Sequence, residues 1–263
     1  MSIESAVNIT QFSFVKRLIT LIGEFHEVGW KCSGTKNLSI NDYLCLRTKE
    51  NPKCIILLEF HPELTDSKIG MIGSEVIRKI YKNNCQKNME IRKRIIGIDI
   101  RTDYIGRDGQ TNLYNKDKIH SKYTATEFKE TFIDSFFKEN DGYFGLVSQT
   151  HDLDETVQKN MKKYSKQIYN DFIKAETETN NPKKLQLLKE CFAKITDFNI
   201  LLEIFKKRDC NEIIIVVGEF HRKNLTDVLM TFTNITHVST NIPIDSDEED
   251  KPCFLVDDLI VPT

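Results

Sequence analysis

The sequence lacks an excess of charge of either sign. Its 263 residues carry 37 Lys and Arg against 39 Asp and Glu, a net charge of −2. Nucleic acids and anionic membranes are bound largely through clustered basic residues. We therefore expect no nucleic-acid partner and no membrane partner, and a small molecule or a peptide as the substrate. The sequence leaves the oligomeric state open.

Long apolar runs and a secretion signal are also missing. No apolar stretch approaches the roughly 20 residues that a membrane-spanning helix needs. Residues 1–12 lack the basic segment and apolar core of a signal peptide. The 7 cysteines are dispersed and contain no Cys-x-x-Cys pair, which is typical of reduced thiols and disfavours a zinc-thiolate site. We expect a cytoplasmic protein.

Histidine is scarce, and its distribution is uneven. Three of the 6 histidines stand in the same tripeptide, Glu-Phe-His, each time directly after an apolar run. The copies are Glu24-Phe25-His26, Glu59-Phe60-His61 and Glu219-Phe220-His221, and Gly23 and Gly218 precede the first and the last. Such a repeat indicates a site that gathers carboxylates and imidazoles.

Four short apolar runs rich in β-branched residues predict strands that are buried on both faces, as in a parallel sheet. They cover residues 18–22, 54–58, 95–98 and 213–217, and weaker strand patterns stand at 235–239 and 254–256. Helices are predicted over 40–48, 67–83, 124–139, 152–176, 182–207 and 224–231, with Asp152 as the cap of the fourth. This alternation predicts an α/β fold with a mainly parallel central sheet flanked by helices.

The sequence predicts a single α/β domain over residues 1–263. Residues 124–207 interrupt the strand pattern, and we interpret them as a helical insertion within that domain. Residues 242–251 contain a run of acidic side chains and are predicted to form a surface loop.

The three Glu-Phe-His copies stand where strands are expected to end, and parallel α/β sheets bind ligands beyond the carboxyl ends of their strands. On extended backbone, residues i and i+2 share a face. Each Glu and His is therefore expected to project together, with the Phe pointing into the helix layer. Carboxylate oxygen and imidazole nitrogen suit a divalent metal such as Zn²⁺ or Mn²⁺. Without a metal, the same groups can act as general acid and base.

Asp99 and Arg101 belong to this predicted site by position, because Asp99 ends the third apolar run. An arginine there can balance carboxylate charge or bind an anionic substrate group; a purely structural ion pair is the alternative. In the middle copy Glu59 is a better candidate than His61, because a carboxylate that closes an apolar strand has few structural reasons to be there.

These motifs and their order resemble the superfamily of erythromycin esterase-like, ChaN-like and TraB/Tiki-like proteins. Residues 21–26 resemble its first motif, a strand followed by Gly-Glu-x-His, and residues 57–59 resemble its second strand, which ends in Glu. Residues 216–221 resemble its late Gly-x-x-His motif, and residues 96–99 are similar to a Gly-x-Asp segment of the esterase branch. The resemblance covers residues 18–100 and 212–240.

The resemblance implies His26, Glu59 and His221 as the catalytic or metal-binding set. The Tiki branch implies a metal-dependent peptidase, and the esterase branch implies hydrolysis assisted by His and Glu without an essential metal. The ChaN branch implies heme or iron binding. This chain departs from the pattern by carrying Glu219 inside the last motif, where many relatives have a small residue.

The combined hypothesis is a hydrolase with a His/Glu site, with or without a divalent metal (Mn or Zn), at the carboxyl edge of the sheet. Glu24 and Glu219 are expected to be further ligands or to orient the histidines. Two alternatives stay open: a heme, iron or small-ligand binding protein, and a catalytically silent interaction protein. The predicted catalytic set comprises His26, Glu59, His221, Glu24, Glu219, Asp99 and Arg101. The hypothesis requires the three strand ends to be neighbours in the sheet.

Overall fold

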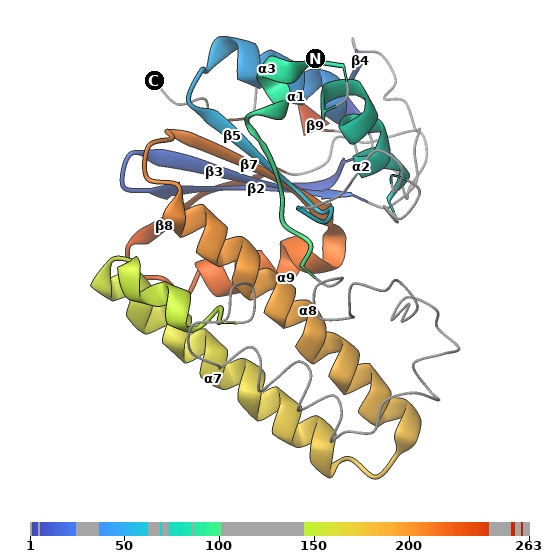
Figure 1. Cartoon of the computed structure of the whole chain (residues 1–263), viewed down its shortest axis with the longest axis vertical. Coiled ribbons are helices and arrows are strands. Elements are labelled where there is room, and N and C mark those ends of the chain that lie inside the picture. The colour runs from blue at the N-terminus through green and yellow to red at the C-terminus, as the bar shows by residue number, and fades with distance from the viewer. Residues whose placement is uncertain are drawn as a thin grey trace. The chain divides into compact units, whose positions relative to one another are not determined.

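The structure is a computed structural model of the chain, and it describes residues 2–4, 6–24, 37–62, 69, 74–85, 87–100, 145–241, 254–255 and 259. Two compact units are present, one made of Met1–Ile98 with Lys207–Thr263 and one made of Asp99–Lys206. Figure 1 shows the elements of both. The predicted insertion starts at residue 124, whereas the second unit starts at Asp99. The predicted helix 124–139 and the predicted acidic loop 242–251 lie outside the described residues.

The first unit is built on a six-stranded sheet in the order β6-β5-β7-β3-β2-β8. The strands are β6 (Ile95–Gly97), β5 (Cys54–Leu58), β7 (Glu212–Gly218), β3 (Arg17–Glu24), β2 (Ala6–Phe14) and β8 (Ile235–Asn241). The four apolar runs are confirmed as β3, β5, β6 and β7, and the pattern at 235–239 is confirmed as part of β8. Every residue of β7 is buried, which explains its unbroken apolar run, because helices cover both faces of such a strand.

The α/β class is confirmed, but the prediction of a mainly parallel sheet is wrong, because the sheet is mixed. Strands β6, β5, β7 and β3 are parallel, whereas β2 pairs antiparallel with both β3 and β8. A tight turn at Val15 and Lys16 joins β2 to β3, with Val15 at a φ of 57°. The sequence analysis missed β2 because polar residues interrupt its apolar pattern. Gln11 is one of them, and its amide donates a hydrogen bond to the Thr20 hydroxyl of β3 over 3.2 Å.

Helices cover one face of this sheet (Figure 1). They are α1 (Ile40–Glu50), α2 (Glu75–Ile80) with the π-helical turn η2 (Tyr81–Cys85), and α3 (Met89–Arg92). Ser39 and Ser74 cap α1 and α2 by accepting hydrogen bonds from backbone N–H groups of their first turns. One apolar cluster joins α1, α2 and η2 to Ile22 of β3 and to alternate residues of β5 and β7, among them Leu58 and Val216. The predicted helix 40–48 is confirmed as α1, and the end of the predicted helix 67–83 as α2 with η2.

A three-stranded sheet in the order β4-β1-β9 accompanies the large one. Its strands are β4 (Asn37–Ser39), β1 (Ser2–Glu4) and β9 (Phe254–Leu255). Ile3 and Phe254 contribute to the same apolar cluster as α1. The weak strand pattern at 254–256 is therefore confirmed for its first two residues, and residue 256 lies outside the described residues.

The described part of the second unit is helical, with η4 (Ser148–Asp152), α7 (Glu155–Thr177) and α8 (Asn181–Lys206). The predicted helices 152–176 and 182–207 are confirmed, but the cap of α7 is Asp154 and not Asp152. The Asp154 carboxylate accepts hydrogen bonds from the N–H groups of Thr156 and Val157. The two helices pair through apolar side chains, including Tyr164 stacked on Phe198 at 6.3 Å between ring centroids.

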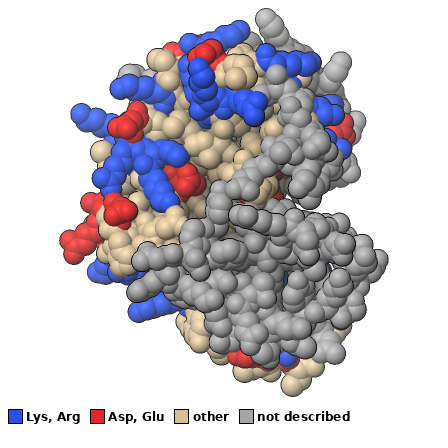
Figure 2. All heavy atoms as spheres, viewed as in Figure 1, with Lys and Arg blue, Asp and Glu red and all other residues tan. Residues whose placement is uncertain are grey.

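The surface carries charges of both signs, in keeping with the nearly equal numbers of basic and acidic residues in the sequence. On the face shown in Figure 2, described Lys and Arg side chains lie among Asp and Glu side chains. Within the described ranges, no helix is both long and apolar enough to cross a membrane.

Candidate functional site

The three Glu-Phe-His copies follow three adjacent strands. Strand β7 lies between β5 and β3, and all three strands run parallel. Their carboxyl ends therefore meet at one edge of the sheet, as the sequence hypothesis requires. Glu24 ends β3, Glu59 directly follows β5, and Glu219 directly follows β7. The three copies nevertheless have different local structures.

The structure brings together Glu59, directly after β5, and His221, which follows β7. The Glu59 Oε1 atom lies 3.6 Å from the His221 Nε2 atom, with side chains only 8% and 7% exposed. The second carboxylate oxygen of Glu59 accepts a hydrogen bond of 2.7 Å from the Gly218 N–H. This bond ties the residue after β5 to the last residue of β7, so the carboxylate is held at a defined place beside the imidazole.

The last copy begins a helix instead of extending a strand. Helix α9 (Glu219–Leu229) starts directly after Gly218, so the predicted helix start at residue 224 is five residues too late. In a helix, successive residues turn by about 100°, so residues i and i+2 point to different sides. Glu219 and His221 therefore point apart, contrary to the expectation from extended backbone. Phe220 is 51% exposed and does not enter the helix layer.

Glu219 pairs with Arg222 one turn further along α9. Both carboxylate oxygens accept hydrogen bonds of 2.6 Å from the Arg222 guanidinium. The same guanidinium donates to the Thr10 hydroxyl of β2 at 2.9 Å and to the Thr226 hydroxyl of α9 at 3.2 Å. A Cβ atom on Gly23 would lie 2.0 Å from Glu219 Oε2. The first glycine of the repeat thus makes room for an ion pair that follows the last glycine.

The first copy divides between the two faces of the sheet. Gly23 faces α9, so strand alternation turns the Glu24 side chain to the opposite face. Glu24 is buried there, and its Cα pairs with that of Gly218 in the ladder. The structure therefore separates Glu24 from Glu219 across the sheet. Phe25 and His26 lie outside the described residues, so the placement of His26 stays a prediction.

The rest of the middle copy turns toward the helix layer. Phe60 is buried against Tyr81, at 5.1 Å between ring centroids, and fits against Gly97 of β6, where a Cβ atom would lie 2.6 Å from the Phe60 carbonyl oxygen. Phe60 thus behaves as predicted for the phenylalanines of the repeat. His61 is partly buried.

Asp99 and Arg101 follow β6, the outermost strand of the parallel group. Asp99 is half-buried and is the first residue of the second unit. Arg101 lies outside the described residues. The predicted pairing of these two side chains stays a prediction.

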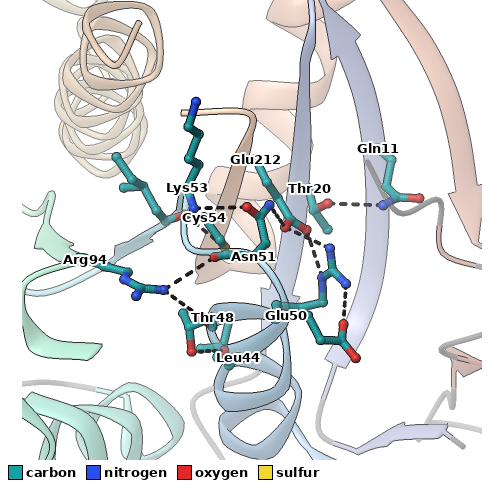
Figure 3. A network of polar contacts seen from close by, with 12 residues as sticks. Gln11, Thr20, Leu44, Thr48, Glu50, Asn51, Lys53, Cys54, Arg94 and Glu212 are labelled. Atoms are coloured by element: carbon teal, nitrogen blue, oxygen red, sulfur yellow. Dashed lines mark hydrogen bonds and ion pairs between the residues drawn. The ribbon is translucent and has the colours of Figure 1, made fainter. Parts of the chain in front are cut away.

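A second polar network, missed by the sequence analysis, lies at the amino end of β7 (Figure 3). The Glu212 carboxylate accepts hydrogen bonds from Arg47 of α1 at 3.1 and 2.9 Å and from the Asn51 amide at 2.9 Å. Arg47 also donates to Glu50 at 2.7 Å. The available signal was Glu212 itself, a carboxylate that opens a wholly apolar strand, but its partner is 165 residues away in the chain.

The electrostatics of this network raise the pKa values of Arg47, Tyr43 and Cys54. Burial alone would lower the pKa of Arg47, but the hydrogen bonds and charge of Glu212 outweigh burial and raise it. Burial, and next the charge of Glu212, raise the pKa of Tyr43 and of the Cys54 thiol. Tyr43 and Cys54 therefore stay neutral near neutral pH, and a neutral thiol is a poor nucleophile.

Within the described ranges, no group of three or more His, Cys, Asp or Glu side chains is arranged to hold a metal ion. Glu59 and His221 belong to these described ranges, whereas His26, the third predicted ligand, lies outside them. No family model, no curated protein and no solved structure matches this chain.

Proposed function

We propose that this protein is a hydrolase in which Glu59 and His221 form the proton-transfer centre. The observation that carries the proposal is their contact: a buried carboxylate oxygen 3.6 Å from a buried imidazole nitrogen. The pair stands at the carboxyl edge of the parallel strands, where α/β enzymes bind their substrates. The resemblance to the erythromycin esterase-like superfamily is part of the same proposal.

The chemistry of the pair supports a general base. A carboxylate next to one ring nitrogen stabilises the imidazolium that forms when the other nitrogen takes a proton. Glu59 Oε1 faces His221 Nε2, so Nδ1 is the nitrogen that acts on the substrate side. The Gly218 N–H, which donates to Glu59 Oε2, keeps the carboxylate in place during this transfer.

The proposed reaction is the hydrolysis of an ester or amide. A water molecule attacks the carbonyl carbon while His221 takes one of its protons, and a tetrahedral oxyanion forms. The bond from carbon to the leaving oxygen or nitrogen then breaks, and the imidazolium returns its proton to the leaving group. The products are a carboxylic acid and an alcohol or amine, and His221 ends neutral, as it began.

A divalent metal is an optional part of the proposal. Glu59 and His221 would hold it, because carboxylate oxygen and imidazole nitrogen are suitable ligands for Zn²⁺ or Mn²⁺. A bound metal would lower the pKa of a coordinated water molecule and so supply hydroxide near neutral pH. Elemental analysis after purification with added metal tests this part. Less than about 0.1 equivalent of metal per protein rules out a site that binds its ion as tightly as structural metal sites do.

The proposal is tested with a panel of chromogenic esters and anilides and a fluorogenic peptide set. We expect Glu59→Gln and His221→Gln to lower kcat/KM by about 100-fold or more, as removal of a general base does. His26→Gln is included because the sequence predicts it for the same set. His237→Gln is the matched control, because His237 is exposed and stacks edge-on against Phe12 of β2. If exposed histidines alone catalysed the hydrolysis, His237→Gln would lower kcat/KM as much as His221→Gln does.

Two results contradict the proposal. One is hydrolysis that Glu59→Gln and His221→Gln leave unchanged. The other is no hydrolysis of any substrate, with or without added Mn²⁺ or Zn²⁺, by protein shown to be folded. The second result favours the catalytically silent interaction protein.

A further inference from the structure

Arg222 is a buried cation whose contacts hold the first turn of α9 against the sheet. Its side chain is 8% exposed, and its guanidinium contacts Glu219, Thr10 and Thr226 at once. Helix α9 packs against β3, β7 and β2. The Thr10 contact is the important one, because it crosses from the helix to a different strand. The Arg222 side chain therefore anchors α9 to β2 as well as to its own first turn.

The anchor decides which way His221 points. His221 and Arg222 are consecutive helix residues, so their side chains leave the axis about 100° apart. The strand order places β3 and β2 on one side of β7 and β5 on the other. Arg222 reaches Thr10 on β2, and His221 reaches Glu59 after β5. A rotation of the first turn that moved Arg222 away from Thr10 would also move His221 relative to Glu59.

Gly23 is what allows the helix to sit so close. A Cβ atom there would lie 3.0 Å from Arg222 Cδ as well as 2.0 Å from Glu219 Oε2. The Glu219–Arg222 pair thus lies directly against the backbone of β3, and any side chain at position 23 would displace it. This close approach gives Gly23 a packing role that is independent of any ligand.

We propose that Thr10, Gly23, Glu219 and Arg222, here named the Arg222 clamp, position His221 for proton transfer with Glu59. The clamp residues do not touch the reacting atoms; they act through the rotational setting of α9. The catalytic consequence rests on the proposed hydrolase function. The positioning itself does not, because it can be measured on the protein without substrate.

The measurement is a long-range ¹H–¹⁵N spectrum of protein labelled at its 6 histidines, in which ring nitrogen shifts report tautomer, protonation and hydrogen bonding. His221→Gln assigns the His221 signals. In Arg222→Lys, which keeps the charge but removes the planar fork, we expect the His221 signals to shift or broaden while those of His237 stay unchanged. Glu219→Gln is expected to give the same result. If a substrate has been found, Arg222→Lys is expected to lower kcat by about 10- to 100-fold with a smaller change in KM.

Lys223→Gln is the matched control. Lys223 is the next residue of α9 and is exposed, so this change alters the charge of the helix by one unit, opposite in sign to Glu219→Gln, without touching the clamp. We expect it to leave the His221 signals in place. If Lys223→Gln moves them as much as Glu219→Gln, a simple charge effect replaces positioning and the proposal is overturned.

The proposal is also overturned if the His221 signals of Arg222→Lys and Glu219→Gln coincide with those of the unchanged protein. Thr10→Val decides the matter if those two variants do not fold, because it removes a single hydrogen bond of the clamp. Shifted His221 signals in Thr10→Val support the clamp, and coincident signals contradict it. A protein that hydrolyses nothing yet shows these shifts retains the clamp and loses only the proposed function.

Discussion

The two ends of strand β7 both carry an Arg–Glu pair, and the pairs differ in how completely they are enclosed. At the amino end, Arg47 and Glu212 have side chains 5% and 1% exposed. At the carboxyl end, Arg222 is similarly buried, but Glu219 is 25% exposed. Only the carboxyl end adds an imidazole, that of His221, next to a third carboxylate, that of Glu59.

This difference between the two ends of β7 bears on where the proposed proton transfer takes place. At the amino end, hydrogen bonds from Arg47 and Asn51 reach both oxygens of Glu212, so its charge is held in one arrangement. At the carboxyl end, the 3.6 Å separation of Glu59 and His221 is longer than a hydrogen bond. Its energy depends on whether the imidazole carries a proton. The amino end therefore holds its charges in one arrangement, and the carboxyl end is where the proposed function places proton transfer.

The largest expected effect is the loss of Glu212. Glu212→Ala leaves Arg47 buried with only Glu50 as a charged partner, and breaking a buried pair in this way costs about 3–5 kcal/mol of unfolding free energy. Glu219→Ala is expected to cost about 1–2 kcal/mol, because Glu219 is partly exposed and Arg222 keeps both threonine contacts. Urea unfolding followed by circular dichroism measures both.

Glu90→Ala serves as the control for these two variants. Glu90 and Lys93 form an exposed pair at 3.0 Å, and because water screens such pairs, we expect almost no change in the free energy of unfolding. Equal costs for Glu212→Ala and Glu219→Ala would remove the contrast between the two ends of β7.

The next effect is that of Gly23→Ala. Its added methyl group would overlap the Glu219 carboxylate, and overpacking of this kind costs about 1–3 kcal/mol. A Glu219→Ala background lacks the carboxylate that the added methyl group would overlap. In that background Gly23→Ala is expected to cost at least about 1 kcal/mol less unfolding free energy. Urea unfolding of the four proteins of this double-mutant cycle gives the coupling. A cost of Gly23→Ala that is the same in both backgrounds would show that the carboxylate does not press on β3.

The smallest expected effect comes from Asp171 of α7, whose partly exposed carboxylate is a reference for the pairs at both ends of β7. Its carboxylate pairs with Lys194 of α8 at 2.6 Å and with Lys174 at 3.0 Å. Burial alone would raise the pKa of Asp171, but hydrogen bonds from the two lysines outweigh it and lower the pKa. A lowered carboxyl pKa contributes stability above the ordinary value of about 3.9 and loses it as the pH falls through the lowered value.

We therefore expect Asp171→Asn to cost about 0.5–1 kcal/mol at pH 7 and progressively less as the pH is lowered below about 4. Urea unfolding of both proteins over a pH series measures the difference. Lys183→Gln is a suitable companion, since Lys183 in the first turn of α8 pairs at 2.8 Å with Glu178, the residue directly after α7. A cost of Asp171→Asn that grows toward acid pH would contradict the assignment.

Local sequence predicts strands correctly where burial alone determines the structure. The run at 213–217 is buried throughout and the run at 54–58 nearly so, and local composition therefore identifies β7 and β5 without knowledge of their neighbours. It failed at β2, where Thr10 and Gln11 are buried polar residues whose partners, Arg222 and Thr20, lie on other elements. Such residues look like loop residues until their partners are known.

The start of α9 shows the same limit at the candidate site. Glu219-Phe220-His221 has the same three letters as the middle copy, yet it is helical whereas Glu59-Phe60-His61 is not. Gly23 leaves room on β3 for the Glu219–Arg222 pair in the first turn of α9. That contact joins residues almost 200 positions apart in the chain, so the local pattern around Glu219 does not contain it.

Local sequence was therefore sufficient for the apolar strands, for the polar residues that close them and for the choice of Glu59 as a candidate. The strand order β5-β7-β3 was needed to bring Glu59 to His221, to hydrogen-bond Glu59 to Gly218 over a separation of 159 residues, and to join Arg47 to Glu212. The physical reason is that apolar periodicity records how deeply a residue is buried but not which neighbour it meets. Which neighbours meet depends on how parallel strands are ordered once their connecting helices have packed.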